Sequence, residues 1–419
     1  LGLVAVPATR RFLAARGRPP LSRPALWAWG LVLFVLVLAI AVTGSRGMAL
    51  GLLAGFAVVV AVTRRDIPAS RLIALCSIVV AAYVAANILI GSGMVSERLV
   101  SILNPARSGH ERFLIWREAW RLLMEAPWFG IGLGTYWLYW PPYRHPDDAS
   151  GGFYVHNDYL QIWIETGLPG LLLLLAVYVA VFVMFVRLVR HPGTPPTARV
   201  EAAGLFGGLL AIAVHTFFDF DLYIHPIQLL MGLVLIRLHA LYLAHVPAGV
   251  FVIQPAQRVG RRAYRIISFL VILLPLMYFA ALGGSAMLTY KARDLMARAQ
   301  WVDASDTLSR AAQLMPTSDL VPTAHADLLR QAIMQLPRGA PERTILFKEA
   351  LVLLAEAEKQ NPLRPQIFFI RGLLYNQNPD LAGSDWAALA ARAYATALKR
   401  DPLAFWARET YAGLLMWQG

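Results

Sequence analysis

Charge and cysteine are both scarce in this sequence. Only 15% of its 419 residues are charged, against about a quarter in a typical soluble domain, and 58% are hydrophobic. The single cysteine, Cys76, lies inside an apolar run. A disulfide within the chain is therefore excluded, and a cysteine-based metal site is not expected. The low charge argues against a soluble protein.

Acidic residues are also few relative to basic ones. The chain has 38 lysines and arginines but 25 aspartates and glutamates, which gives a net charge of +13. A basic excess is typical of nucleic-acid-binding proteins. Here, however, the arginines cluster between apolar runs: Arg10, Arg11, Arg16, Arg18 and Arg23; Arg64, Arg65 and Arg71; Arg187, Arg190 and Arg199; and Arg258, Arg261, Arg262 and Arg265. This is the positive-inside pattern of a membrane protein, and no nucleic-acid partner is expected.

Apolar segments of about 20 residues are what a helix needs to cross a bilayer. Seven candidates cover residues 25–43, 47–63, 71–91, 167–186, 201–218, 226–244 and 265–288. Backbone polar groups in lipid must be paired within the segment, so each is predicted to be a helix. The predicted fold class is all-α, a polytopic transmembrane bundle with a helical tail.

The arginine clusters also predict the orientation. With every cluster in the cytoplasm, residues 1–24 form a basic cytoplasmic flank and residues 25–288 form the transmembrane bundle. The loop 92–156 and the tail 289–419 then lie outside the cytoplasm.

Three short sequences in the tail end alike. Each is predicted to be a helix rich in small residues that a proline stops, at Pro316, Pro362 and Pro402, so the pattern recurs every 40 to 46 residues. It resembles degenerate tetratricopeptide helix pairs, whose usual period is about 34. Such pairs stack into a concave surface for partners; a simple helical bundle is the alternative.

The loop 92–156 is too long for a simple connector. Residues 112–121 have the spacing of an amphipathic helix at a membrane interface. The glycines of Gly130-Ile131-Gly132-Leu133-Gly134 do not predict a dinucleotide site, because no strand precedes them. We expect them to allow a tight backbone path.

Several short motifs occur in order along the chain: Thr43-Gly44-Ser45-Arg46, Arg112-x-x-x-Trp116, Pro127-Trp128-Phe129-Gly130-x-Gly132, His156-Asn157 with Leu160, Glu165-x-Gly167-x-x-Gly170, and His215 with Asp219-x-Asp221. Together they resemble the O-antigen ligase family over roughly residues 25–245. That family includes ligases that join O-antigen to lipid A-core, polysaccharide polymerases and protein O-oligosaccharyltransferases.

The resemblance implies an enzyme of the bacterial inner membrane with a periplasmic active site and tail. The expected donor is a glycan on undecaprenyl diphosphate, and the expected acceptor is lipid A-core or another glycan or protein. O-antigen ligation is the predicted reaction; polymerisation or protein glycosylation is the close alternative. Family members usually have about ten or more membrane helices, so we expect further helices before Leu1, which is not a methionine.

Catalytic and binding roles follow from the same resemblance. His156 is the expected general base, since imidazole side chains can accept a proton near neutral pH. Arg46 and Arg112 are expected to bind the diphosphate, because guanidinium groups grip phosphate oxygens in pairs. Supporting roles are assigned to three further residues, Asn157, Asp219 and Asp221.

No cofactor and no metal are expected, because His110, His145 and His225 show no ligand spacing. Two non-enzyme hypotheses are a transporter and an assembly scaffold. A transporter would carry polar residues near the bilayer midplane, whereas the notable polar residues here lie at the predicted outer edge. A scaffold would not need Arg46 or His156.

Overall fold

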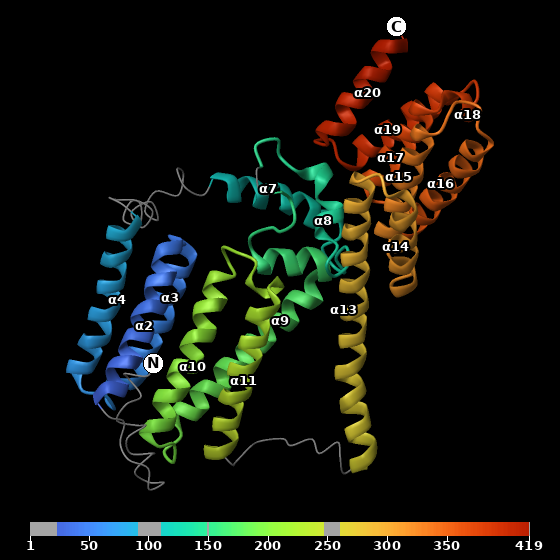
Figure 1. Ribbon diagram of the computed structural model, residues 1–419. Helices are drawn as coiled ribbons and strands as arrows, with labels where there is room; N and C mark the ends of the chain where they lie inside the picture. Colours follow the sequence, from blue (N-terminus) through green and yellow to red (C-terminus); the bar gives the residue numbers. More distant parts are fainter. Residues whose placement is uncertain (1–22, 91–109, 149–150, 247–259, 419) are drawn as a thin grey trace. The chain divides into compact units, whose positions relative to one another are not determined.

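The computed structural model describes residues 23–90, 110–148, 151–246 and 260–418. These residues form helices and turns with no strand among them, which confirms the predicted all-α class. Their helices divide into two compact units, α2 to α11 and α13 to α20 (Figure 1). Most of the flank 1–24 and the first part of the loop 92–156 lie outside the described residues.

The first unit is the membrane unit. Its described helices are α2 (Arg23–Thr43), α3 (Arg46–Thr63), α4 (Ala69–Ile90), α7 (His110–Glu125), α8 (Tyr136–Tyr139), η2 (Pro141–Tyr143), α9 (Asp158–Arg190), α10 (Pro196–His215), η3 (Asp221–Tyr223) and α11 (His225–His245). Helix α3 packs along α10, and α2 packs against α4.

Each of the seven predicted membrane segments forms a helix. Within the described residues, six helices are long and apolar enough to cross a bilayer: α3, α4, α9, α10, α11 and α13 (Arg261–Ala297). The apolar stretch of α2 is shorter, Trp27–Thr43. By length and composition, six of the seven predicted spans are therefore confirmed.

Glycines allow α3 and α10 to approach closely. A Cβ atom on Gly51 would lie 2.3 Å from the carbonyl oxygen of Ala211, and one on Gly55 would lie 2.3 Å from that of Gly207. Within a membrane, small residues of this kind let helix backbones meet and gain van der Waals contact. This packing brings the start of α3 to the end of α10.

Helix α9 begins at Asp158, well before the segment predicted from residue 167, because it continues through a kink. The kink is at Gly167, whose φ of 69° and ψ of −174° are not helical. A Cβ there would lie 2.2 Å from the carbonyl oxygen of Trp128. Gly167 thus has both the conformation and the close contact that only glycine tolerates.

The loop after α7 packs against α9 at its kink. Gly130, with a φ of 71°, crosses so near α9 that its Cβ would lie 2.5 Å from the Glu165 carbonyl. Three backbone hydrogen bonds join the two segments: Ile131 N to Ile164 O (2.9 Å), Gly132 N to Glu165 O (2.9 Å) and Leu168 N to Pro127 O (3.1 Å). They pair backbone groups that the kink leaves without helical partners. The predicted tight backbone path at these glycines is confirmed.

The second unit is the tail unit. It contains α13 and then α14 (Trp301–Leu314), α15 (Leu320–Gln335), α16 (Pro341–Gln360), α17 (Pro365–Gln377), α18 (Pro379–Ala382), α19 (Trp386–Arg400) and α20 (Phe405–Gln418). Helices α14, α16 and α19 end just before Pro316, Pro362 and Pro402, where the repeated pattern predicted helix ends. Their membership of the tetratricopeptide class stays a prediction.

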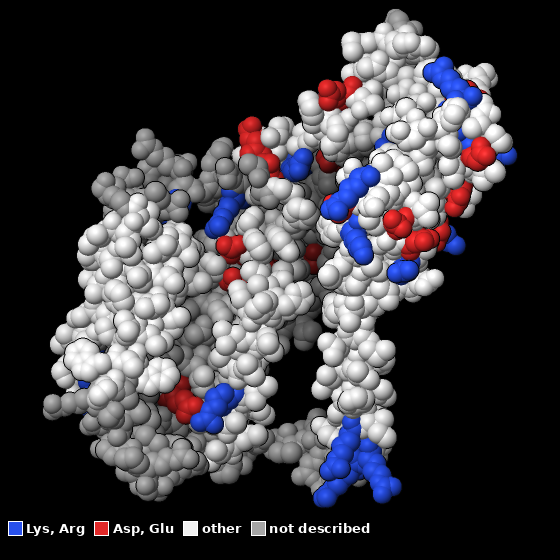
Figure 2. Space-filling view, in the orientation of Figure 1, with Lys and Arg blue, Asp and Glu red and all other residues white. Residues whose placement is uncertain are grey.

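Helix α13 runs without a break across the expected domain boundary at residue 288. It packs against α14 and α15 and groups with the tail helices, so the described contacts divide the chain before α13. Figure 2 shows basic side chains at the start of α13, an uncharged stretch after them, and charges of both signs over the later helices. That distribution fits a spanning helix that continues into a polar domain.

Candidate active site

Helix α7 carries the two named side chains of the Arg-x-x-x-Trp motif on neighbouring turns. Arg112 and Trp116 are four residues apart, so they share one face of the helix. The Trp116 indole donates a hydrogen bond to the carbonyl of Val155 (3.1 Å). The Arg112 guanidinium lies 3.7 Å from the carboxylate of Asp219. The Arg-x-x-x-Trp motif therefore ties α7 to the segment that carries His156.

His156 is held in an unusual backbone conformation. Its φ of 55° is in the left-handed region, which few residues other than glycine adopt and which costs conformational energy. The preceding Val155 is fixed from both sides, by Trp116 and by the Gln161 side chain, which accepts from Val155 N (3.0 Å). Asn157 caps α9 by accepting from Leu160 N (3.1 Å). The surrounding contacts therefore hold His156 at the start of α9.

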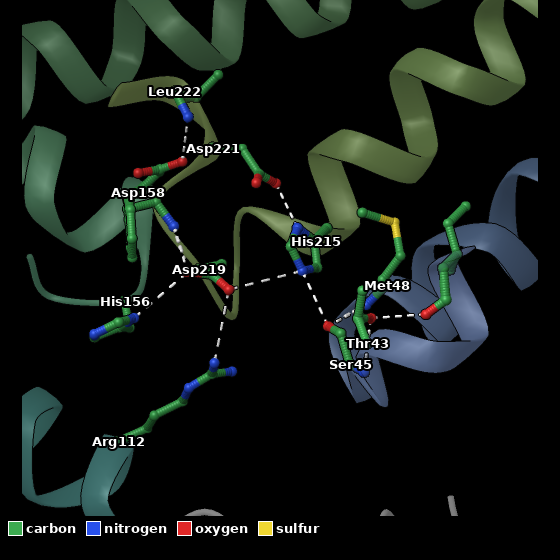
Figure 3. Close-up of polar contacts among 12 residues, drawn as sticks. Thr43, Ser45, Met48, Arg112, His156, Asp158, His215, Asp219, Asp221 and Leu222 are labelled. Atoms are coloured by element: carbon green, nitrogen blue, oxygen red, sulfur yellow. Dashed lines mark hydrogen bonds and ion pairs between the residues drawn. The ribbon is translucent and has the colours of Figure 1, made fainter. Parts of the chain in front are cut away.

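Asp219 is the meeting point of the site. Its carboxylate lies 3.4 Å from Nδ1 of His156, 3.7 Å from Nη2 of Arg112 and 3.9 Å from Nε2 of His215 (Figure 3). Burial favours its neutral form, but the His156 hydrogen bond and the neighbouring Arg112 guanidinium lower the pKa of Asp219 overall. The carboxylate is therefore ionised at neutral pH.

The contact with Asp219 also determines which nitrogen of the His156 ring carries the proton. A carboxylate can only accept, so Nδ1 of His156 carries the proton in this contact. In the neutral ring, Nε2 then holds the free lone pair. The side chain of His156 is 22% exposed, so it is partly open to solvent. This arrangement suits a general base oriented by a carboxylate.

The turn between α10 and α11 places Asp219 and is itself fixed to α9. The Asp158 carboxylate accepts from Leu222 N (2.8 Å), and Asp158 N donates to Thr216 O (2.9 Å). Phe220 stacks on Tyr154, with ring centroids 4.2 Å apart. Contacts on both sides of Asp219 thus limit its freedom to move.

Glu165 joins three parts of the membrane unit. It is 1% exposed, and its carboxylate accepts from Gly134 N (2.9 Å), Tyr136 N (3.2 Å) and the Tyr223 hydroxyl (2.7 Å). Burial and the neighbouring Glu165 raise the pKa of Tyr223, so its hydroxyl keeps the proton that it donates. The glutamate of the Glu-x-Gly-x-x-Gly motif therefore connects α9 to the glycine loop and to the turn after Asp219.

His215 is a functional candidate that sequence analysis did not select. Its Nδ1 lies 2.5 Å from Asp221, and its Nε2 lies 3.2 Å from the Ser45 hydroxyl. Both His215 and Asp221 are buried. His215 lies in the stretch His215–Asp221, which resembles the family, and that resemblance is the feature of the sequence that points to it.

Arg46 is the first residue of α3 and directly follows Ser45. Its side chain is half-buried at the end of α3 that meets His215. The Ser45 contact brings this end of α3 to the turn that bears Asp219. Convergence of Arg46 itself with Arg112 and His156 stays a prediction.

Among the described residues, no group of three or more His, Cys, Asp or Glu side chains is arranged to hold a metal ion. The site contains the positively charged Arg112 beside the His156–Asp219 pair. Such a set can remove a proton from a hydroxyl and stabilise a departing phosphate group.

In a comparison with protein families, residues 31–175 match the O-antigen ligase family model. No curated protein and no solved structure gave a match. The matched range includes Arg46, Arg112, His156 and Glu165, and it ends before Asp219. Residues 31–175, which lie within the membrane unit, are therefore similar to the O-antigen ligase family.

Proposed function

We propose that this protein transfers a glycan from undecaprenyl diphosphate to an acceptor hydroxyl, with ligation of O-antigen to lipid A-core as its reaction. The observation that carries the proposal is the shared contact of His156 and Arg112 with Asp219. His156, the proposed base, and Arg112, a cation, come from separate motifs of the family and meet at the carboxylate of Asp219.

The chemistry is a single displacement at the anomeric carbon of the donor. Nε2 of His156 takes the proton of the acceptor hydroxyl, whose oxygen forms a bond to that carbon. The bond from the carbon to the diphosphate oxygen breaks, and the diphosphate leaves with the electron pair. Asp219 holds the imidazole in the required tautomer and stabilises the imidazolium that forms.

Arg112 and Arg46 are assigned to the diphosphate. Negative charge grows on the leaving oxygen as the bond breaks, and guanidinium groups stabilise it through paired hydrogen bonds. Arg112 is 41% exposed beside Asp219, so its guanidinium is accessible to a donor. No metal is required in this scheme, since the two arginines supply the positive charge.

An apolar cavity supports a lipid-linked donor. It has a volume of about 300 Å³ and lies between α2, α3, α4 and α10. Its lining includes Gly55, Gly207 and Ala211, which are on the same two helices as Ser45 and His215. A prenyl chain in this cavity would lie about one helical turn or more from the polar site.

The proposed orientation puts the site and the tail unit in the periplasm. Phosphatase fused after residue 150 or after residue 300 should be active outside the cytoplasm. A fusion near residue 195, beside the basic end of α9, should be silent. Activity at residue 195 would contradict the orientation.

A protein acceptor is the second candidate, and the helical tail favours it. Stacked helix pairs offer a surface on which a protein can dock. Deleting the gene and examining the surface glycans separates the alternatives. Loss of glycan from lipid A-core supports ligation. Retention of single repeat units points instead to polymerisation, and loss of glycan from secreted proteins points to protein glycosylation.

A further inference from the structure

The start of α3 is held unusually close to the turn after α10. Gly44, with a φ of 61°, lets the chain reverse before Ser45, which begins the helix as its N-cap. One residue into α3, a Cβ on Gly47 would lie only 3.0 Å from the His215 ring and 3.0 Å from Cβ of Phe218. The two segments therefore pack against each other without room for a side chain.

His215 makes the polar contacts across this junction. Its Nδ1 lies 2.5 Å from the Asp221 carboxylate and donates to it, because a carboxylate can only accept. In the neutral ring, Nε2 then accepts from the Ser45 hydroxyl at 3.2 Å. Figure 3 shows the ring lying between the two partners, with Asp219 beside it. His215 is 6% exposed and has little freedom to turn.

The contacts from Ser45 through His215 to Asp221 resemble a nucleophilic triad, but the Ser45 hydroxyl also caps a helix. Its oxygen accepts the hydrogen bond of Met48 N (3.2 Å) and so caps α3. With one lone pair used by the cap and the proton directed at His215, the oxygen serves as a link between two segments.

We infer that His215 is a positioning residue that holds the start of α3, with Ser45 and Arg46, against the turn that carries Asp219. The inference rests on the proposed function. Arg46 is on α3, whereas Arg112 and His156 meet at Asp219. One diphosphate can contact both arginines only if the spacing between the two groups is fixed. The bonds of His215 to Ser45 and Asp221 set that spacing.

A double-mutant cycle tests the link. Ser45→Ala removes the hydroxyl, and His215→Asn keeps an amide near Asp221 but is too short to reach Ser45. The measurement is equilibrium binding of undecaprenyl diphosphate, without glycan, to the purified full chain in detergent. Each single variant should weaken binding by about threefold to tenfold, the size expected of one hydrogen bond. The double variant should be no weaker than the worse single variant.

The tail unit supplies a matched control. Ser305 and His325 form the same kind of contact, with Oγ and Nε2 3.1 Å apart. Ser305→Ala and His325→Asn should leave binding unchanged. Melting temperatures of all variants show whether a loss of affinity is a loss of fold.

Additive losses in the cycle, or unchanged binding in both single variants, would overturn the inference. If His215→Asn does not fold, Ser45→Ala is compared with Ser45→Thr, which keeps both the cap and the hydroxyl. Threonine must restore binding, and failure to do so rejects the link. The proposed function fails separately: full glycan transfer by His156→Ala would reject it, whatever the cycle shows.

Discussion

The membrane unit and the tail unit pack their helices by different means. In the membrane unit, α3 and α10 meet through glycines, and polar side chains are buried at the end where these helices meet the turn of Asp219. In the tail unit, the core is built from alanines and leucines such as Ala304, Leu308 and Ala350. Burying polar groups is costly unless they serve each other or a reaction. In the tail unit the buried Arg343 is paired with Asp380 and Asn378. In the membrane unit, Asp219 is shared by His156, Arg112 and His215, so we expect the chemistry there.

The largest effect should come from Asp219→Asn. The amide has the same shape but no charge, so it neither fixes the His156 tautomer nor stabilises the imidazolium. Glycan transfer should fall by about 10²–10⁴-fold, as when the carboxylate of a catalytic triad is replaced by an amide. Initial rates with lipid-linked donor measure this. A variant with near-normal rates would place the chemistry elsewhere.

In the tail unit, a buried arginine should affect stability alone. Arg343 is 5% exposed and contacts both Asp380 (2.5 Å) and the buried Asn378 (3.1 Å). Arg343→Met leaves Asn378 without this donor and should lower the free energy of unfolding by about 1–3 kcal/mol. The exposed pair Arg298–Asp294 is the control.

For that control, Arg298→Met should change the free energy of unfolding by less than about 0.5 kcal/mol. Thermal unfolding followed by circular dichroism compares the two variants. Transfer at a temperature where both are folded should match the unsubstituted protein. A transfer defect confined to Arg343→Met would give the tail a part in the reaction.

Glycine-to-alanine substitutions in the two units should have opposite effects on stability. A Cβ at Gly207 would lie 2.7 Å from the Gly55 carbonyl oxygen, so Gly207→Ala must push α3 and α10 apart. It should cost about 1–3 kcal/mol. At Gly413 in α20 nothing lies within 4 Å of the added atom. There, Gly413→Ala should stabilise by about 0.5–1 kcal/mol through helix propensity. Equal melting shifts for the two variants would contradict the close packing.

A tenfold effect on donor affinity tests the apolar cavity. Gly208 lines it, and no atom lies within 4 Å of an added Cβ. Gly208→Leu should fill the space and raise the KM for a long-chain prenyl donor by roughly tenfold, about 1.4 kcal/mol. Gly232 in α11 is equally open but does not line the cavity, so Gly232→Leu is the control. Similar KM values for the two variants would remove the cavity from the donor site.

Much of the fold could be predicted from local sequence. Long apolar runs predicted where the membrane helices lie, and proline stops predicted the ends of three tail helices. The apolar run predicted a span only from residue 167, because the chain before Gly167 is too polar to resemble one. The predicted end of the loop at residue 156 nevertheless lies next to Asn157, the N-cap of α9. The helix before Gly167 is stabilised by contacts with the glycine loop, including those of Glu165.

The candidate site was predictable only in part. Family motifs selected His156, Arg112 and Asp219 one by one, but spacing along the chain carries no information that they meet. The link between Ser45 and His215 joins residues 170 positions apart. It depends on the glycine packing of α3 against α10. The four-residue spacing of Gly47, Gly51 and Gly55 is typical of a helix-packing face, but nothing in it identifies α10 as the partner.

The most direct test of the mechanism is transfer by purified His156→Ala from a purified undecaprenyl diphosphate-linked glycan in liposomes. The rate should fall by about 10²–10⁴-fold, the usual contribution of a general base. Binding of undecaprenyl diphosphate should persist, because Arg112 and Arg46 remain. A chelator should leave the unsubstituted protein active. Full activity in His156→Ala, or activity lost to the chelator and restored by a divalent metal, would contradict the account.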